Sequence, residues 1–365
     1  MIGFIIKLNG PISLIGKAAV QSAQLAIDEV NAAGGVLGGP LELKIADDAT
    51  DPSTARQVWE NLASKNVDAF IFRETSAARV AVLPVAEIAN IPAIYANAYE
   101  GGDCPPVLYT AGEIDPQKSR PYLEFLKGKG ATKLYVQVSD INWGRTVVEM
   151  VKAAATEMQL EIVGEEYSPT TADYSPYITK IRNSGADALL WGMGGGPDNV
   201  AFYKQARSAG LLKKLKVVGN LALDDTSLKA VGGAAEGTYM VASYFMSDDS
   251  AANQKYVEGL KAKYGADMRE QSTYSEPSYD SVHLYALAVN KAGTTEASAV
   301  LKALSEVEFT GSPKGSVRMN ADRHAAMPIY IAQATSEGTY KVVDTLGVQE
   351  PPVQCPTPPA FGTAQ

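Results

Sequence analysis

The sequence predicts an α/β protein made of two similar lobes, each built on a parallel sheet. Short apolar runs of strand length alternate with longer segments whose apolar residues recur at helical spacing. This alternation begins at residue 2 and starts again after about residue 117. The chain has 365 residues, a length that favours two domains over one. Strands that alternate with helices predict parallel sheets with right-handed crossovers.

In the first half of the chain, apolar runs predict strands over residues 2–8, 41–46, 69–72, 91–96 and 107–109. A helix is predicted over 16–32, where Gly34 and Gly35 end it. A second helix begins near Pro52, with Asp51 or Ser53 as its N-cap. A third follows residue 75, with Thr75 or Ser76 as its cap and with Val80, Leu83, Glu87 and Ile88 at helical spacing.

The second half repeats the same kind of unit and then turns helical. Strands are predicted over residues 133–138, 160–166, 188–191 and 216–219, with helices opening at 139–145 and covering 174–184 and 198–209. Beyond the strand-like residues 239–245, helices are predicted over 251–264, 278–292 and 298–305. Strand-like pieces at 315–319, 329–333 and 340–343 precede a tail rich in proline and glycine.

Composition excludes several partners. The net charge is −9 and no basic cluster occurs, which argues against nucleic acid or an anionic membrane as partner. No apolar run is long enough to span a membrane. The chain starts almost directly in a strand, so a signal peptide is not expected within it. Either such a segment was removed and Met1 added, or the protein is cytoplasmic.

The cysteines and histidines give no metal or catalytic motif. Cys104 and Cys355 lie in proline-flanked segments without metal-ligand spacing. They either form a disulfide that ties the C-terminal tail to the first lobe, in an oxidising compartment, or remain two unrelated thiols. The two histidines, His283 and His324, are far apart. We therefore expect no metal, no cofactor and no catalytic residue.

One stretch, residues 69–102, predicts a small-ligand site. It contains a strand, a helix, a second strand and a tyrosine-bearing loop. The carboxyl ends of parallel strands line the ligand crevice of an open sheet. Ser76, at a helix N-terminus, should therefore share one wall with Asn97 and Tyr99, at a strand end. Backbone N–H groups and the helix dipole at that point favour an anionic or carbonyl oxygen.

Several motifs, taken in order, resemble the type I periplasmic solute-binding proteins of the leucine/isoleucine/valine-binding family. The similarity extends to about residue 345. The motifs are Gly10-Pro11 with Gly16, Asn31 with Gly34-Gly35, Asp47-Asp48 with Asp51-Pro52, and the segments 140–144, 205–210 and 235–237. Segments that look closest to the urea- and short-amide-binding branch are 84–87, 99–101, Glu276 with Tyr279, and 320–324.

The resemblance implies a fold of two Rossmann-like lobes with parallel sheets, joined by a three-strand hinge. The hinge crossings are expected near residues 113–119, 240–247 and 324–329. The first lobe would contain residues 1–115 plus 246–325, the second 118–242 plus 328–348, and the tail 349–365.

The resemblance also implies the residues of the ligand site. Ser76, Asn97, Ala98 and Tyr99 would form the first-lobe wall. Ile15 would add an apolar surface, and Tyr274 and Glu276 a lining segment. From the second lobe, Trp143 would close over the ligand, and Gly194 and Gly195 would leave room beside it. Leu221 stands where amino-acid binders carry an acid, which argues against an ordinary α-amino acid; Asp224 or Asp225 could replace that acid or simply cap a helix.

Four of these residues have a structural alternative. Ser76 can also serve as a plain helix cap, Tyr99 as an ordinary surface aromatic, Trp143 as a core residue, and Glu276 as a structural carboxylate near the hinge.

The implied function is the extracytoplasmic, periplasmic solute-binding component of an ABC importer. A monomer would bind an amino acid, an amide, a urea-like molecule or a small carboxylate by hinge closure, and a membrane ABC permease would be its partner. The alternative is an amide-type ligand-sensing regulator of the same fold. An enzyme is disfavoured because no nucleophile or acid–base pair converges in the predicted crevice.

Overall fold

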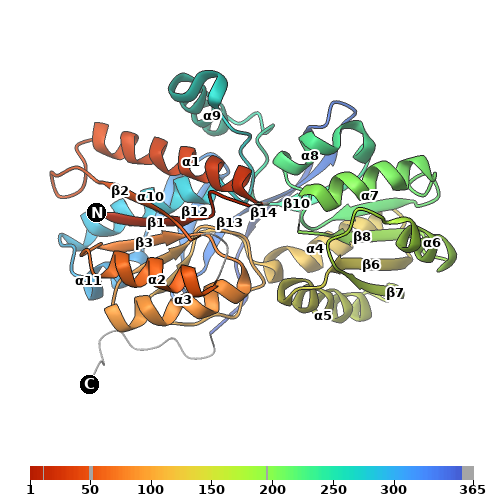
Figure 1. The fold of residues 1–365 in the computed structure, drawn as a ribbon, viewed down its shortest axis with the longest axis horizontal. Coiled ribbons are helices and arrows are strands. Elements are labelled where there is room, and N and C mark those ends of the chain that lie inside the picture. The colour runs from red at the N-terminus through yellow and green to blue at the C-terminus, as the bar shows by residue number, and fades with distance from the viewer. Residues whose placement is uncertain (11, 49–51, 195, 356–365) are drawn as a thin grey trace. The chain divides into compact units, whose positions relative to one another are not determined.

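The computed structural model describes residues 1–10, 12–48, 52–194 and 196–355. It contains two compact units, each an α/β structure with a mostly parallel sheet, which confirms the predicted fold class (Figure 1). Unit 1 is Met1–Ile114, Asp249–Pro328 and Val348–Gln365, and unit 2 is Asp115–Asp248 and Ile329–Gly347.

Unit 1 is built on five parallel strands in the order β2-β1-β3-β4-β5. Helices α1 and α10 pack together on one face of this sheet, and α2 and α3 cover the other (Figure 1). Helices α9 and α11 complete the unit. The bounds are β1 Ile2–Ile6, α1 Ser13–Ala32, β2 Leu43–Asp47, α2 Pro52–Ala63, β3 Ala69–Phe72, α3 Ser76–Ala89, β4 Ala93–Tyr95, β5 Leu108–Thr110, α9 Ala251–Tyr264, α10 Pro277–Ala292 and α11 Ala297–Leu304.

Helix α3 begins where the sequence predicted, but it buries a different face. Thr75 is its N-cap, and the Thr75 side chain accepts a hydrogen bond from the Ala78 backbone N–H at 3.4 Å. Val80 and Ile88, grouped by spacing with Leu83, are 60% and 83% exposed. The buried face comprises Ala78, Arg79, Val82, Leu83, Val85 and Ala86. The arginine at this face belongs to the site described below.

Unit 2 is built on strands in the order β7-β6-β8-β9-β10-β13, with β14 paired to β13. Strands β6 to β10 run parallel, and β13 is antiparallel to β10. The bounds are α4 Asp115–Gly128, β6 Lys133–Ser139, α5 Asn142–Glu157, β7 Glu161–Ser168, α6 Ser175–Asn183, β8 Ala188–Gly192, α7 Gly196–Ser208, β9 Val217–Asn220, α8 Asp225–Val231, β10 Tyr239–Ala242, β13 Ala325–Ala334 and β14 Tyr340–Gln349.

The core of unit 2 is rich in aromatic rings. Trp191, on β8, stacks on Phe202 of α7 with ring centroids 3.5 Å apart, and Tyr174 contacts both edge-on. Gly164, on edge strand β7, makes room for the Tyr135 ring of β6, since a Cβ at residue 164 would lie 2.2 Å from that ring. These contacts fix the sheet whose strand ends carry the second set of candidate residues.

Several elements of the described residues have no counterpart among the predicted ones. Helices α4 and α8 were not predicted, nor was strand β11 (Glu308–Ser312), which forms a hairpin with the predicted β12 (Gly315–Met319). Proline occurs at 116 and 121 and obscures α4 in the sequence, because proline inside a helical pattern normally marks an end. Strand β12 also pairs with the first residues of β13.

Candidate functional site

Three charged side chains follow three neighbouring strands of unit 1. Lys7, after β1, donates to Asp48 Oδ2 at 2.5 Å and to Glu74 Oε2 at 2.7 Å, and all three side chains are buried. Burial raises the pKa of Glu74 well above its ordinary value, and the neighbouring Asp48 carboxylate adds to the shift. Burial alone would lower the pKa of Lys7, but its two carboxylate partners raise it. Sequence reasoning missed this triad, because Lys7 lies inside the predicted strand 2–8 and Asp48 and Glu74 each lie two residues beyond a predicted strand.

Ser76 lies at the first position of α3, where its hydroxyl donates to Glu100 Oε2 at 3.1 Å. Glu100 is also paired with Arg79, whose Nη2 lies 2.7 Å from Glu100 Oε1. Arg79 Nε donates to Asp103 Oδ2 at 2.5 Å. Although burial alone would lower the pKa of Arg79, Tyr95, Glu100 and Asp103 raise it, so the guanidinium stays charged.

Asn97 lies at the end of β4, beside this cluster. Its Nδ2 donates to the Tyr95 hydroxyl at 3.1 Å, and that hydroxyl donates in turn to the Glu74 carbonyl at 2.6 Å. The Arg79 Nη1 donates to the same hydroxyl at 3.3 Å. Asn97 Oδ1 is buried without a hydrogen-bond partner. The neighbouring Ala98 is half-buried.

Tyr99 supports this wall from inside the unit, and its ring does not line the surface. The side chain is buried, and its hydroxyl lies 2.5 Å from His324 Nε2. His324 Nδ1 is 2.8 Å from the Asp322 carbonyl, which can only accept, so Nδ1 carries the proton and Nε2 accepts from Tyr99. The Arg79 guanidinium lies 4.4 Å from the Tyr99 ring centroid. Sequence reasoning treated Tyr99 as a ligand contact because its burial could not be read from the chain.

The remaining candidate residues of unit 1 differ in how far their side chains are exposed to solvent. Glu276 is fully buried and lies 2.7 Å from Lys314 Nζ, which also contacts Asp280 at 3.1 Å. This environment fits the structural alternative and corrects the expectation of a lining carboxylate. Burial and the neighbouring Asp280 charge raise the pKa of Glu276. Tyr274 is half-buried, with the Arg73 guanidinium 5.8 Å from its ring centroid, and Ile15 is half-buried in the first turn of α1.

In unit 2, Trp143 lies in the first turn of α5. It is half-buried, and its Nε1 donates to Asp115 Oδ2 at 2.8 Å, so the indole N–H is occupied. Gly194, after β8, is exposed, and its N–H donates to Ser139 Oγ at 3.0 Å. Leu221 is 3% exposed and packs beside Gly192 in the interior of unit 2.

The structure shows the role of Asp224, whereas several other predicted residues lie outside the part of the chain that it describes. Asp224 caps α8 by accepting from the Ser227 backbone N–H at 3.0 Å, which fits a helix-capping acid. The predicted site residue Gly195, the motif residue Pro11, the candidate cap Asp51 and residues 356–365 of the tail lie outside the described residues.

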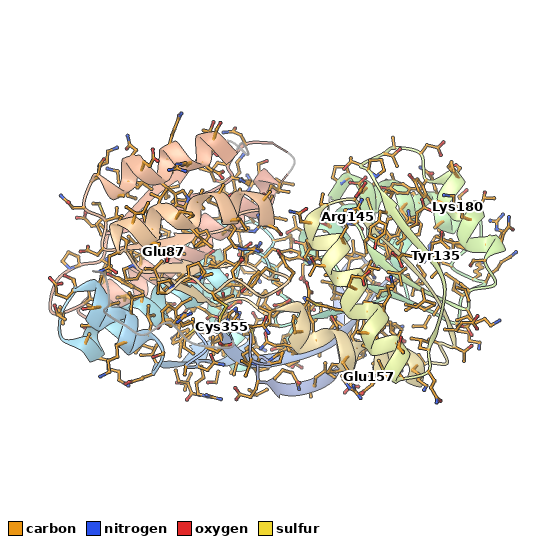
Figure 2. All side chains as sticks on the ribbon, turned by 90° about the horizontal axis from the view of Figure 1, so that it is seen from below. Glu87, Tyr135, Arg145, Glu157, Lys180 and Cys355 are labelled. Carbon is orange, nitrogen blue, oxygen red and sulfur yellow. A yellow bond between two sulfur atoms is a disulfide. The ribbon has the colours of Figure 1, made fainter. Side chains whose placement is uncertain are left out.

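Cys104 and Cys355 form a disulfide with a Cα–Cα distance of 5.8 Å (Cys355 is labelled in Figure 2). Asp322 accepts backbone hydrogen bonds from Gln354 at 2.6 Å and from Cys355 at 3.1 Å. Arg323 Nη2 donates to the Cys104 carbonyl at 3.3 Å. The beginning of the tail is therefore tied to the loop that carries His324, the partner of Tyr99.

The described residues show neither a metal-binding cluster nor a helix that could span a membrane. They contain no group of three or more His, Cys, Asp or Glu side chains that could hold a metal ion. None of the described helices combines the length and apolar character needed to cross a bilayer.

The chain matches the family model described as "Periplasmic binding protein" over residues 1–339, and it belongs to that family. It is 28% identical, over 370 aligned positions, to the Leu/Ile/Val-binding protein homolog 6 of Brucella melitensis biotype 1, with 96% of this chain and 92% of that protein covered. This agrees with the leucine/isoleucine/valine-binding resemblance. The urea- and amide-binding branch stays a prediction.

Solved structures share the fold. A solute-binding protein of an ABC transporter from Rhodopseudomonas palustris HaA2, in complex with p-hydroxybenzoic acid, has a TM-score of 0.88 at 22% identity, over 96% of this chain and 97% of that one. A branched-chain amino acid transporter substrate-binding protein from Streptococcus pneumoniae, in complex with isoleucine, has a TM-score of 0.83 at 23% identity, over 96% and 99%. At these identities the likeness concerns the fold alone.

Proposed function

We propose that the protein is the extracytoplasmic solute-binding component of an ABC importer. Its ligand would be an amino-acid-like or amide molecule, a urea-like molecule or a small carboxylate. Membership of the periplasmic binding protein family supports this class of function. A permease in the membrane would recognise the ligand-bound form.

The observation that carries the proposal is the polar wall at the start of α3. Ser76 and Glu100 are partly accessible there, and Asn97 offers an acceptor without a protein partner. Binding sites need a few polar groups of this kind on a rigid frame. The frame is rigid because Arg79 and Tyr95 hold Glu100 and Asn97 from the buried side.

We propose that binding is completed by hinge closure, with Trp143 and the Gly194 turn as the unit 2 contacts. A ligand stabilises a closed state only if it binds that state better than the open one. A half-buried indole and an exposed glycine backbone suit a contact that forms on closure. The urea- and short-amide-binding branch remains the finer proposal for the ligand.

A thermal-shift screen tests the proposal. Branched-chain amino acids, short amides, urea and benzoates are added to the protein, and the melting temperature is recorded, because a ligand bound only by the native state raises it. We expect one of these classes to raise the melting temperature, and small-angle scattering to report a smaller radius of gyration with that ligand. A flat response to every class would contradict the proposal.

Variants then locate the site. Trp143→Ala should weaken binding of the ligand found in the screen at least tenfold by calorimetry while the circular dichroism spectrum is unchanged. Glu87→Gln, on the exposed far end of α3, is the control and should bind normally (Glu87 is labelled in Figure 2). Equal affinities for wild type and Trp143→Ala would remove Trp143 from the site.

A further inference from the structure

We infer that Glu100 selects the ligand class at the α3 wall: the ligand group that meets this wall is a hydrogen-bond donor, as in an amide, a urea or an alkylammonium, and not a carboxylate. The inference rests on the proposed function and makes its ligand more specific. It also reverses the expectation, drawn from the helix N-terminus alone, that Ser76 receives an anionic or carbonyl oxygen.

The first step is that the Ser76 hydroxyl is already used. A serine hydroxyl has one proton to donate, and Ser76 donates it to Glu100 Oε2 at 3.1 Å. A protein carboxylate thus lies where the start of α3 would favour a ligand carboxylate. A second carboxylate there would lack the Ser76 proton and would be repelled by Glu100.

The second step is that ion pairs hold Glu100 in place. Arg79 is 2% exposed, and its guanidinium contacts Glu100 at 2.7 Å and Asp103 at 2.5 Å. One positive charge therefore faces two negative charges, which leaves this cluster with a net charge of −1. Moving Glu100 aside would strip a buried guanidinium of one partner, which is unfavourable. The other nearby arginine, Arg73, lies against the Tyr274 ring instead.

The third step concerns Asn97, which supports the same polarity independently. Its orientation is fixed because the Tyr95 hydroxyl gives its proton to the Glu74 carbonyl and can only accept from Asn97. The Nδ2 group therefore faces Tyr95, and Oδ1 is the acceptor left without a partner. Asn97 is 8% exposed, so this acceptor is buried and its pairing with a donor is favourable.

The Glu100 and Asn97 side chains both offer acceptors to a ligand, and the proton of the Ser76 hydroxyl is already used. The Glu100 side chain is 12% exposed, so its remaining lone pairs can be reached from outside. An NH₂ group of an amide or urea, or an alkylammonium, can donate to Glu100 and to Asn97. A wall of acceptors therefore favours ligands with N–H donors over carboxylates such as isovalerate or benzoate.

The test compares two sets of probes by calorimetry and thermal shift. Acetamide, urea and propylammonium are the donors, and isovalerate and benzoate are the carboxylates. We expect wild type to bind a donor and to bind both carboxylates at least tenfold more weakly. Glu100→Gln removes the charge and keeps the size of the side chain. It should weaken propylammonium binding at least tenfold and reduce the difference in affinity between the donors and the carboxylates.

Matched variants keep the result interpretable. Glu100→Asp retains the charge beside Arg79 and should still reject carboxylates, so it serves if Glu100→Gln does not fold. Asp103→Asn makes the same charge change next to Arg79 without touching Ser76, and its effect on ligand class should be smaller than that of Glu100→Gln. Glu87→Gln makes that change on the exposed end of α3 and should leave binding unchanged.

The outcomes separate the two proposals. If wild type binds a carboxylate and rejects all donors, Glu100 does not select the ligand and the inference is wrong, while solute binding stands. If Glu100→Gln changes ligand preference no more than Asp103→Asn does, the inference is also wrong. If no probe and no compound of the wider screen binds wild type, the proposed function itself fails.

Discussion

The carboxyl ends of the strands differ in chemistry between the two units. In unit 1, Lys7, Asp48 and Glu74 follow neighbouring strands and form buried ion pairs. In unit 2, the corresponding strands β6 and β7 end in Ser139 and Ser168, whose hydroxyls both contact the Met193 sulfur. Buried charges thus follow the strands of unit 1, whereas the strand ends of unit 2 carry these neutral hydroxyls, and the charged Asp140 after β6 is exposed and paired with Arg145. The difference suggests that unit 1 discriminates charge and that unit 2 supplies shape.

The largest expected effect comes from breaking the charged edge. Lys7→Met leaves Asp48 and Glu74 buried without their cation, and removal of one partner from a buried pair destabilises by about 3–5 kcal/mol. Ser139→Ala, at the end of the first strand of unit 2, removes a neutral hydrogen bond and should cost about 1 kcal/mol. Urea unfolding at pH 7 measures both. Equal losses would mean that the two edges do not differ energetically.

The second prediction concerns the disulfide of unit 1, which links the loop at Cys104 to the start of the C-terminal tail. The Cys104–Cys355 disulfide joins residues 251 positions apart, and its loss should destabilise the protein by about 2–5 kcal/mol, the typical cost of removing a native disulfide. The double variant Cys104→Ser/Cys355→Ser should melt at a lower temperature than wild type. Added dithiothreitol should lower the melting temperature of wild type toward that of the variant and leave the variant unchanged. A wild-type melting temperature that ignores complete reduction would contradict this.

The third prediction is a pH dependence centred on unit 1. Burial lowers the pKa of His324 below its ordinary value of about 6.5, so the unfolded chain binds this proton more readily than the folded one. Stability should therefore fall as the pH drops below about 6.5. Urea midpoints between pH 5 and 8 should show a shallower slope for His324→Gln than for wild type. His283→Gln is the control. If its slope were as shallow as that of His324→Gln, the pH dependence could not be assigned to His324.

The sequence predicted the fold class because strand and helix periodicities are local properties. Runs such as residues 69–72 and 251–264 match their observed elements without knowledge of the rest of the chain. The same reasoning missed α4, whose prolines resemble a helix end, and misjudged the buried face of α3. That face is set by Arg79, a charged residue that only its partners Glu100 and Asp103 allow to be buried.

The candidate site was predictable in position but not in the orientation of its side chains. Ser76 and Asn97 follow from the rule that ligands meet the ends of parallel strands. The burial of Tyr99 depends on His324, 225 residues further along the chain, and that of Glu276 on Lys314. Long-range pairs of this kind leave no periodic signal. The available signal was a charged residue close to a strand end, since Lys7 lies near the end of the predicted strand 2–8 and Glu74 two residues beyond 69–72.

The smallest expected effect on stability concerns the amino ends of the strands of the unit 2 sheet. Asp187, before β8, accepts from the Thr132 and Lys133 backbone N–H groups at 2.9 and 2.8 Å and from Lys216 Nζ at 2.8 Å. Although partial burial favours the protonated acid, these hydrogen bonds lower the pKa of Asp187. Its stabilisation should be present above about pH 4 and be lost as the pH falls further. Asp187→Asn should lower the free energy of unfolding by about 1 kcal/mol at pH 7, and its difference from wild type should shrink below pH 4.

Unit 2 would then lose a charged contact only in strong acid, whereas the His324 contact of unit 1 weakens already below neutral pH. A deficit of Asp187→Asn that stays constant down to pH 3 would show that the contribution of Asp187 does not depend on its charge.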